Sequence, residues 1–396
     1  MSEQEKTTPN ENGEMNIQYS DEEHEKPKRR GTKEDEMKII TSSGHRHHRH
    51  HSKKSSRRRK KKKLKKILLI VGVVLLSLIL IALSAVAVMY YTGKNEMKPE
   101  KVKLNTPASV DSVEDGQYVY YKGAKYRYKS DIVNMLFMGI DENNYVLPKG
   151  AIGSNGSADM IALAAIDKNE SKVTIINIPR DIMTDVKAYS LTGGYSGVKK
   201  MQIALSYAYG DGKDTSCVNT MTAVRSLFYN VPISSYFSLQ MEGVADLNDS
   251  IGGVDVTCPS SVGPFVKGEK YHLEGSDALL FVRKRDMDSA DANLKRNDRQ
   301  KVYLKSFISK FVKQTKKDIG VPIKVFNATA PYSCTNLNPN RVTYLATEYI
   351  LNRDMKVYMK SVPVTAKVNS NKNAENYVKE DQFFELFLSV FYEKVK

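Results

Sequence analysis

The stretch IVNMLFMGID, Ile132–Asp141, is an almost continuous apolar run that ends in an aspartate. Two similar runs follow it, DMIALAAID at Asp159–Asp167 and KVTIINIPRD at Lys172–Asp181. Runs of this kind are typical of strands covered on both faces, because a strand with one solvated face alternates apolar and polar residues. They predict the central strands of a mixed or parallel sheet packed between helices.

Segments with helical character alternate with these strands. We expect helices at 201–210, 217–230, 274–285, 294–314, 342–352 and 381–395, and short strands at 254–257 and 355–364. Helices and strands in alternation are typical of a layered α/β domain. Residues 131–396 are therefore predicted to form a single α/β domain with a mixed central β-sheet flanked by helices, large enough for a substantial core.

The chain before this domain divides into three parts. Residues 93–130 are rich in Lys, Pro, Tyr and Gly, and we expect a stalk with a short hairpin around 117–129. Residues 67–92 carry no charge. This run exceeds the roughly 20 apolar residues that span a bilayer and is too long for the apolar core of a signal peptide, about 7–15 residues. It predicts a transmembrane helix, or signal-anchor.

Residues 1–66 form a basic tail. They hold 20 Lys and Arg and 11 Asp and Glu, a net charge of 20 − 11 = +9, and the rest of the chain holds 61 − 20 = 41 basic and 45 − 11 = 34 acidic residues, a net +7. The low apolar content predicts disorder. The block SRRRKKKKLKK directly before the span predicts a cytoplasmic tail and an extracytoplasmic domain. Beside a membrane, such a block favours anionic lipid headgroups over nucleic acid as its partner.

Histidine and cysteine usage excludes several kinds of site. Six of the seven histidines lie in the tail, including the tract HRHHRHH at 45–51, which is either a metal-binding tract or a solvated polar segment. Only His272 remains in the domain, which argues against a Ser-His-Asp hydrolase or a multi-histidine zinc site. Cys217, Cys258 and Cys334 form no C-x-x-C pair. An outer location permits a disulfide, but the sequence does not choose the pair.

Two aspartates at strand ends are candidate metal ligands. Asp141 closes the first apolar run and Asp159 opens the second. Two such carboxylates, together with waters and phosphate oxygens, could hold Mg²⁺ or another divalent cation. The alternative is that each aspartate only caps a turn, because aspartate is common at loop junctions.

Arginines concentrate in two places. Arg180 follows a proline and precedes Asp181, and the stretch FVRKRDMDSADANLKRNDRQK holds further candidates, namely Arg283, Arg285, Arg296, Arg299 and Gln300. Arginine forks match the geometry of phosphate oxygens, so the cluster predicts a pyrophosphate site. The alternative is a solvated, charged helix face. No Walker motif or G-x-G-x-x-G is present, so an anionic substrate on the outer leaflet fits better than a soluble nucleotide.

The motifs in this order resemble the LytR-CpsA-Psr family over residues 131–310. The residues that carry the resemblance are NMLFMGID, SADMIALAAID, VTIINIPRD, MQIALSYAYGDG, LNDSIGGVDV, LEGSDALLFVRKRD and LKRNDRQ. The resemblance implies a phosphotransferase of a Gram-positive-type envelope. It would transfer a glycopolymer, such as teichoic acid or capsular polysaccharide, from an undecaprenyl-pyrophosphate carrier to a peptidoglycan hydroxyl. It also implies Mg²⁺ and a hydrophobic lipid groove.

The resemblance assigns roles to the residues already named. Asp141 and Asp159 would be the metal carboxylates, and the arginines with Gln300 would bind the pyrophosphate. The chain departs from the family at Ser157 and Ala158, where an arginine is common, and at Gln202, where a lysine is common. Asn293 occupies the position of the candidate base, so Asp291 or Asp181 is expected to take the proton.

Two apolar segments and three rival functions complete the predictions. The segments VRSLFYN and KSFISKFV either line the lipid site or form ordinary core. The first rival function is a lipid-pyrophosphate hydrolase that transfers to water. The second is a non-catalytic binder of envelope polymers, and the third is a membrane regulator that acts through the basic tail.

Overall fold

The computed structural model describes residues 53–141, 156–190, 192–286, 292–351, 354–370 and 374–395. The predictions for residues 1–52, including the histidine tract, and for Asp291 fall outside these ranges. The described chain begins with helix α1, Lys53–Glu96, so the predicted disorder of the tail is wrong for residues 53–66, and the helix extends beyond both ends of the predicted span at 67–92. Within it, Lys60–Glu96 contains a window of mean hydropathy 3.2. Among the described residues, this is one helix long and apolar enough to cross a membrane.

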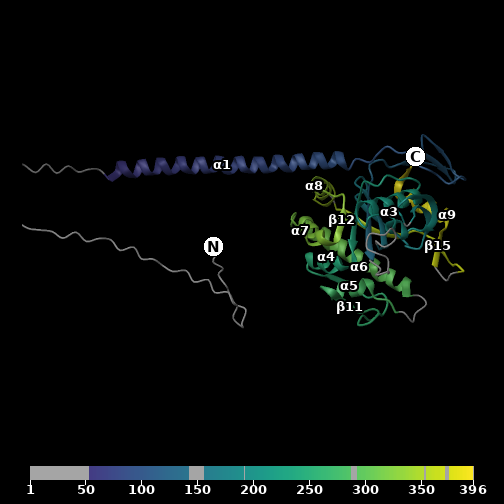
Figure 1. Ribbon diagram of the computed structural model, residues 1–396. Helices are drawn as coiled ribbons and strands as arrows, with labels where there is room; N and C mark the ends of the chain where they lie inside the picture. Colours follow the sequence, from purple (N-terminus) through teal and green to yellow (C-terminus); the bar gives the residue numbers. More distant parts are fainter. Residues whose placement is uncertain are drawn as a thin grey trace, which may run out of the picture. The chain divides into compact units, whose positions relative to one another are not determined.

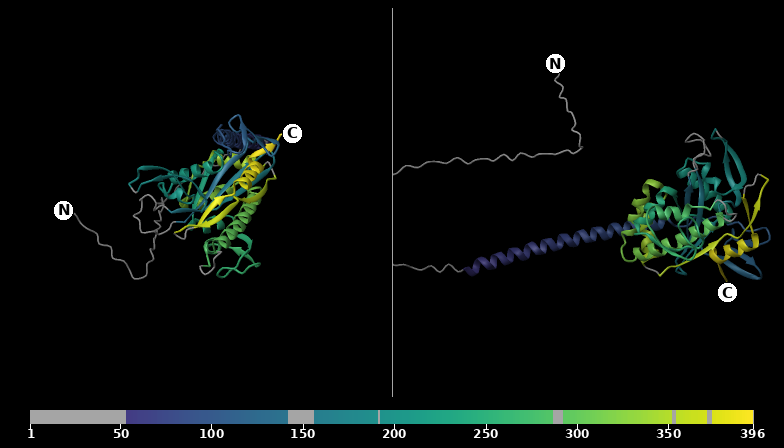
Figure 2. Two further views of the ribbon diagram at one scale, coloured as in Figure 1. Left: turned by 90° about the vertical axis from the view of Figure 1, so that its right-hand side faces the viewer. Right: turned by 90° about the horizontal axis from the view of Figure 1, so that it is seen from below.

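A six-stranded mixed sheet forms the centre of the domain (Figures 1 and 2). Its strand order is β12 (Ser333–Thr335), β9 (Ser235–Gln240), β4 (Val133–Asp141), β5 (Ser157–Asp167), β6 (Lys172–Ile178) and β13 (Lys356–Ser361). β4 pairs with β9 and β6 with β13 in parallel, and the other neighbours are antiparallel. The three apolar runs of the sequence are the three adjacent strands β4, β5 and β6, which confirms the predicted mixed sheet.

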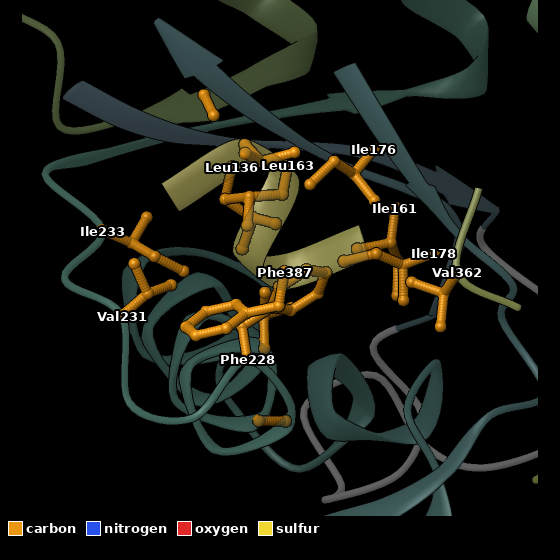
Figure 3. Packing of buried hydrophobic residues seen from close by; sticks show 14 of the residues in the cluster. Leu136, Ile161, Leu163, Ile176, Ile178, Phe228, Val231, Ile233, Val362 and Phe387 are labelled. Carbon is orange, nitrogen blue, oxygen red and sulfur yellow. The ribbon is translucent and has the colours of Figure 1, made fainter. Parts of the chain in front are cut away.

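Helices cover both faces of this sheet. The helices are α2 (Leu205–Ala208), α3 (Asp214–Leu227), α4 (Val244–Ser250), α5 (Ser276–Arg283), α6 (Ala292–Thr315), α7 (Val321–Thr329), α8 (Pro339–Leu345) and α9 (Glu380–Phe391). On one face, Leu136 and Leu163 pack with Phe228, which follows α3, and with Phe387 of α9 (Figure 3). On the other face, Ile175 and its neighbours contact α6. The predicted order of helix, sheet and helix is confirmed.

A second core lies among α4, α5, α6 and α7, beside the hairpin of β10 (Val254–Thr257) and β11 (Lys270–Leu273). Phe281 of α5 and Phe307 of α6 are buried in it. Phe307 belongs to KSFISKFV, and Val224 and Phe228 of VRSLFYN are buried in the main core. Of the two interpretations of these apolar segments, the described residues support ordinary core packing.

The segment predicted as a stalk is part of the folded domain. β1 (Asp111–Val113), β2 (Tyr118–Tyr121) and β3 (Ala124–Tyr128) form a sheet whose last member is the C-terminal strand β16 (Tyr392–Lys394). Leu104 and Val119 are buried in the main core. The predicted hairpin exists. The predicted boundary between stalk and domain at residue 130 was wrong, because β3 pairs with β16 at the C-terminal end of the chain.

Other local predictions were corrected by pairing between distant residues. Part of the expected helix at 201–210 belongs to β8 (Tyr195–Gln202), which pairs with β7 (Met183–Tyr189), and only α2 is helical. The expected strand at 355–364 is β13 followed by the start of β14 (Val364–Val368), which pairs with β15 (Ala374–Val378). The helix expected at 342–352 is α8 continued by a π-helical turn, Ala346–Leu351. Short 3₁₀ turns occupy Met241–Gly243 and Ala330–Tyr332.

Candidate functional site

The two candidate metal aspartates lie beside each other at one edge of the sheet. In the β4–β5 ladder Asp141 is directly opposite Ser157, after a bulge between Gly139 and Ile140. Residues opposite each other, and residues two apart on a strand, share a face of the sheet. Asp141, Ser157 and Asp159 therefore project from one face, and Ser157 Oγ donates to Asp159 Oδ1 at 2.9 Å. The side chain of Asp159 is only 2% exposed.

Arg180 reaches Asp159 from the neighbouring strand. In the antiparallel β5–β6 ladder Ile178 is opposite Ile161, so the chain after β6 passes the start of β5. The Arg180 guanidinium pairs with Asp159 Oδ1, and its Nε lies 3.4 Å from Asp181 Oδ1. The backbone is fixed as well, because Ala204 N–H donates to Arg180 O at 3.1 Å. The Pro-Arg-Asp segment is thus held at the aspartate pair.

Three more arginines arrive from α5 and α6. Arg283, the last residue of α5, places Nη2 3.1 Å from Asp141 Oδ1. Arg285 follows α5, and its Nη2 lies 3.6 Å from Asp159 Oδ2. Arg296 on α6 places Nη1 3.5 Å from the same oxygen. Four guanidinium groups from sequence-distant segments therefore converge on two carboxylates.

Arg296 is the most deeply buried of the four. Its residue is 3% exposed, and its Nε has no hydrogen-bond partner within the described part of the chain. Burial, followed by the nearby Arg285 charge, lowers the pKa of Arg296 to about 10, while Asp159 opposes the shift. A buried cation with an unused donor is costly unless an anion completes its contacts.

The balance of charge in the site is positive. Four arginines face Asp141, Asp159 and Asp181, so the net charge is 4 − 3 = +1 even with every aspartate ionised. Burial raises the pKa of Asp181 above its ordinary value, although the Arg180 charge opposes that shift. Asp181 is therefore a stronger base than an exposed aspartate. Its contact with Arg180 brings a proton acceptor next to the cationic cluster.

Arg299 and Gln300 do not join this convergence. Arg299 is 1% exposed; its Nε donates to Phe281 O at 3.0 Å, and its Nη2 donates to Lys284 O. Gln300 Nε2 donates to Val282 O at 3.1 Å. These carbonyls lie at and just beyond the C-terminal turn of α5, where backbone acceptors lack helical partners. The geometry makes both residues supports for the segment that carries Arg283 and Arg285, rather than phosphate ligands as expected.

The donor set at the strand ends fits a hard cation that is shared with a phosphate ligand. Asp141 and Asp159 offer carboxylate oxygens on one face, and Mg²⁺ is commonly held by one or two carboxylates together with substrate phosphates. Among the described residues there is no group of three or more His, Cys, Asp and Glu that could hold a metal without such a ligand. The pair is thus suited to a metal that arrives with an anion.

Sequence reasoning missed the part played by Ser157. The sequence marked it only as a departure from the family pattern, whereas in the structure its hydroxyl bonds to Asp159. The spacing of two along a strand was the available signal. Gln202, another described departure, donates to the backbone oxygen of Ala374 at 2.6 Å. The side chain of Asn293 lies outside the described residues.

Comparisons with known proteins place the chain in a family. The model of the LytR-CpsA-Psr family matches residues 86–387. The chain is 29% identical over 231 residues to the polyisoprenyl-teichoic acid–peptidoglycan teichoic acid transferase TagU of Oceanobacillus iheyensis, covering 57% of this chain and 64% of that protein. It is 29% identical over 242 residues to the transferase TagV of Bacillus subtilis, covering 58% of this chain and 57% of the relative. The matches therefore span less than two thirds of either relative.

Solved structures show the same fold. Protein gbs0355 of Streptococcus agalactiae superposes with a TM-score of 0.52 at 19% identity, covering 65% of this chain and 86% of that one. The crystal structure of B. subtilis TagV gives a TM-score of 0.50 at 20% identity, covering 66% of this chain and 96% of that one. At these identities the likeness concerns the arrangement of helices and strands alone.

Proposed function

The chain belongs to the LytR-CpsA-Psr family, as its motif order predicted, and on this basis we propose that it transfers a glycopolymer to peptidoglycan. The donor would be the polymer linked to undecaprenyl pyrophosphate, and the product a phosphodiester to a sugar hydroxyl. The relatives named as teichoic acid transferases support this class of reaction. Teichoic acid is the cargo class that those names favour, and capsular polysaccharide is the alternative cargo.

One observation carries the proposal: the buried, unpartnered Nε of Arg296 inside a cluster of four arginines. A surface charge coat would leave its guanidinium groups in water, where no donor is unsatisfied. Here the guanidinium groups lie against Asp141 and Asp159, and each arginine offers five N–H groups, of which the aspartates use only some. A diphosphate has enough oxygens to accept hydrogen bonds from the remaining N–H groups.

In the proposed mechanism the arginines bind and orient the diphosphate. Arg180, Arg285 and Arg296 offset the charge that develops on its oxygens, and Arg283 holds Asp141 in place. Phosphoryl transfer depends chiefly on positioning and on electrostatic stabilisation, so rigid donors account for most of the rate. Arg299 and Gln300 would act by fixing the end of α5. The acceptor hydroxyl attacks the phosphorus nearer the sugar, and undecaprenyl phosphate leaves.

Asp181 is the described residue best suited to accept the proton of the attacking hydroxyl. Its raised pKa brings it closer to the range in which a carboxylate is an efficient base. Asp291 remains the other candidate from the sequence, and it lies outside the described residues. The neighbouring Arg180 Nε, 3.4 Å from Asp181 Oδ1, would hold the carboxylate in one orientation.

We propose that Asp141 and Asp159 hold Mg²⁺, or another divalent cation, together with the diphosphate. When bound, the ion would neutralise charge on the phosphate oxygens. The proposal also sets the location: α1 crosses the membrane once, the basic tail lies in the cytoplasm beside anionic lipids, and the domain faces the cell wall.

The test is incubation of the full chain in detergent with a lipid-pyrophosphate-linked oligosaccharide and a peptidoglycan glycan acceptor. We expect a covalent conjugate whose formation requires Mg²⁺, detected by mass spectrometry. Arg296→Ala should lower the rate by about 10²–10³-fold, the loss typical of a removed electrostatic donor. Lys301→Ala is the matched control, because Lys301 is a partly exposed cation on the same helix that pairs with Asp298.

The same assay separates the rival functions. Free oligosaccharide phosphate without conjugate would identify a hydrolase. A scaffold would bind the donor without turnover. In that case the Asp159→Ala variant should keep the envelope phenotype of the wild type. Deletion of residues 1–60 should leave transfer intact, and loss of the cellular phenotype with intact transfer would instead indicate a regulator that acts through the tail.

A further inference from the structure

Two of the three cysteines lie side by side where α3 meets the edge of the central sheet. Cys334 is the middle residue of β12, directly opposite Ser238 of β9. Residues opposite each other on antiparallel strands have Cβ atoms about 4.5–5.5 Å apart. Cys217 of α3 places its Sγ 3.4 Å from Ser238 Oγ, and that hydroxyl donates to Cys334 O at 3.1 Å. Cys217 therefore packs onto the strand pair at the position of Cys334.

The thiol of Cys334 also reaches the helix. Its Sγ lies 3.3 Å from Oδ1 of Asp214, one helical turn before Cys217 on the same face of α3. Each thiol is close enough to the other to affect its pKa. Asp214 is itself fixed by the hydroxyl of Tyr236, which donates to it at 2.6 Å. Both sulfur atoms are thus held in one small interface between packed elements.

Cys258 belongs to a different part of the domain. It follows β10, is buried in the second core, and its Sγ donates to the backbone oxygen of Ser260 at 3.1 Å. Among the described residues, Cys258 makes no hydrogen bond to either of the other cysteines. The structure therefore indicates which two of the three cysteines could pair, because Cys217 and Cys334 are neighbours and Cys258 is separate.

We propose that Cys217 and Cys334 form a structural disulfide in the exported domain, and that Cys258 stays a thiol. The bond would join α3 to the short edge strand β12, which pairs with one neighbour in the sheet. It would close a loop of more than 100 residues, a length at which a cross-link restricts the unfolded chain strongly. The proposal needs an oxidising compartment and does not depend on the transferase reaction.

The bond would form by exchange with a small-molecule or protein disulfide. The Cys334 thiolate attacks the oxidant, one thiol of the oxidant leaves, and the Cys217 thiolate then attacks Cys334 Sγ and releases the second thiol. Two protons leave the cysteines, and the oxidant takes up two electrons. Cys334 is partly exposed and Cys217 is buried, which sets this order. Burial raises the pKa of Cys217 to about 11, so exchange should be slow once the domain has folded.

The test refolds the full chain from denaturant into detergent with oxidised glutathione, then counts thiols after denaturation and maps peptides without reduction. We expect one thiol per chain and a Cys217–Cys334 peptide in the wild type. Cys258→Ser, the matched control, should retain that peptide and show no thiol. Cys334→Ser should show two thiols. Reduction should lower the melting temperature of the wild type by about 5–10 °C and leave that of Cys334→Ser unchanged.

Three results would overturn the proposal. The first is three free thiols in the oxidised wild type, the second is a bridge that contains Cys258, and the third is a bridge between two chains. The peptide map of the wild type needs no variant, so a poorly folding substitution cannot hide the answer. Because no donor or acceptor substrate enters this experiment, its failure leaves the proposed transfer reaction untouched.

Discussion

Replacing Arg296 with methionine should make the protein more stable while abolishing its activity. Arg296 is 3% exposed, and burial lowers its pKa from 12.5 to about 10. The change of about 2.5 pH units corresponds to roughly 3 kcal/mol, because one unit equals 1.36 kcal/mol. A cation whose folded pKa is depressed disfavours folding at every pH below that value. The wild type therefore carries this penalty at neutral pH, and an uncharged side chain removes it.

The pKa of about 10 already includes the attraction to Asp159, which opposes the shift, and Arg296→Met loses that attraction. The loss is limited, because Asp159 keeps Arg180 and Arg285 as partners and is not left as an unpaired charge. Buried ionic groups replaced by apolar side chains of similar size often give neutral or more stable proteins. We expect a net increase of about 1–3 kcal/mol in the free energy of unfolding, which raises the melting temperature by roughly 2–6 °C.

The matched control is Arg299→Met on the same helix. Arg299 is equally buried, and burial also lowers its pKa, but its donors are satisfied by Phe281 O and Lys284 O. Removing it leaves acceptors at the end of α5 without partners, at about 1–3 kcal/mol each. This variant should therefore lose stability where Arg296→Met gains it.

The assay is thermal and denaturant unfolding of the full chain in detergent at neutral pH, beside the transfer assay. If Arg296→Met destabilises the protein as much as Arg299→Met does, Arg296 is a structural residue and the reasoning about an anion site is refuted. Added pyrophosphate gives a second reading, because it should raise the melting temperature of the wild type and leave that of Arg296→Met unchanged.

Three further outcomes are expected. Asp181→Asn should lose transfer. The midpoint of the acidic limb of the wild-type pH–rate profile should lie above about pH 3.9, the ordinary aspartate pKa, because the pKa of Asp181 is raised. A midpoint at the ordinary value would exclude Asp181 as the base. Asp141→Asn should raise the Mg²⁺ concentration needed for half-maximal transfer, and an unchanged Mg²⁺ dependence would remove Asp141 from the metal site. Tyr392→Ala should cost about 3–5 kcal/mol in unfolding experiments, because the ring is buried and its hydroxyl donates to Gly116 O at 2.6 Å; Tyr195→Ala, at an exposed position, should cost little, and equal losses would contradict the packing of β16.

The central strands and the arginine-rich helices could be predicted because their signals are local. Apolar runs mark β4, β5 and β6, and helical periodicity marks α3, α5, α6 and α9. The aspartates and arginines of the site were found the same way, from their positions at the ends of these elements. The roles of Arg299 and Gln300 could not be predicted in this way. A side chain that donates to backbone carbonyls has the same helical spacing in the sequence as one that faces the site.

By itself the sequence determined the apolar span, the mixed α/β architecture, the family and the set of charged residues available for chemistry. These depend on composition, on periodicity and on the order of motifs, which are properties of neighbouring residues. Tertiary structure alone decided that the stalk belongs to the domain through β3 and β16, that four arginines meet at Asp141 and Asp159, and that Cys217 lies beside Cys334. Each of these depends on contacts between segments far apart in the chain, and such contacts form only when the hydrophobic core brings the segments together.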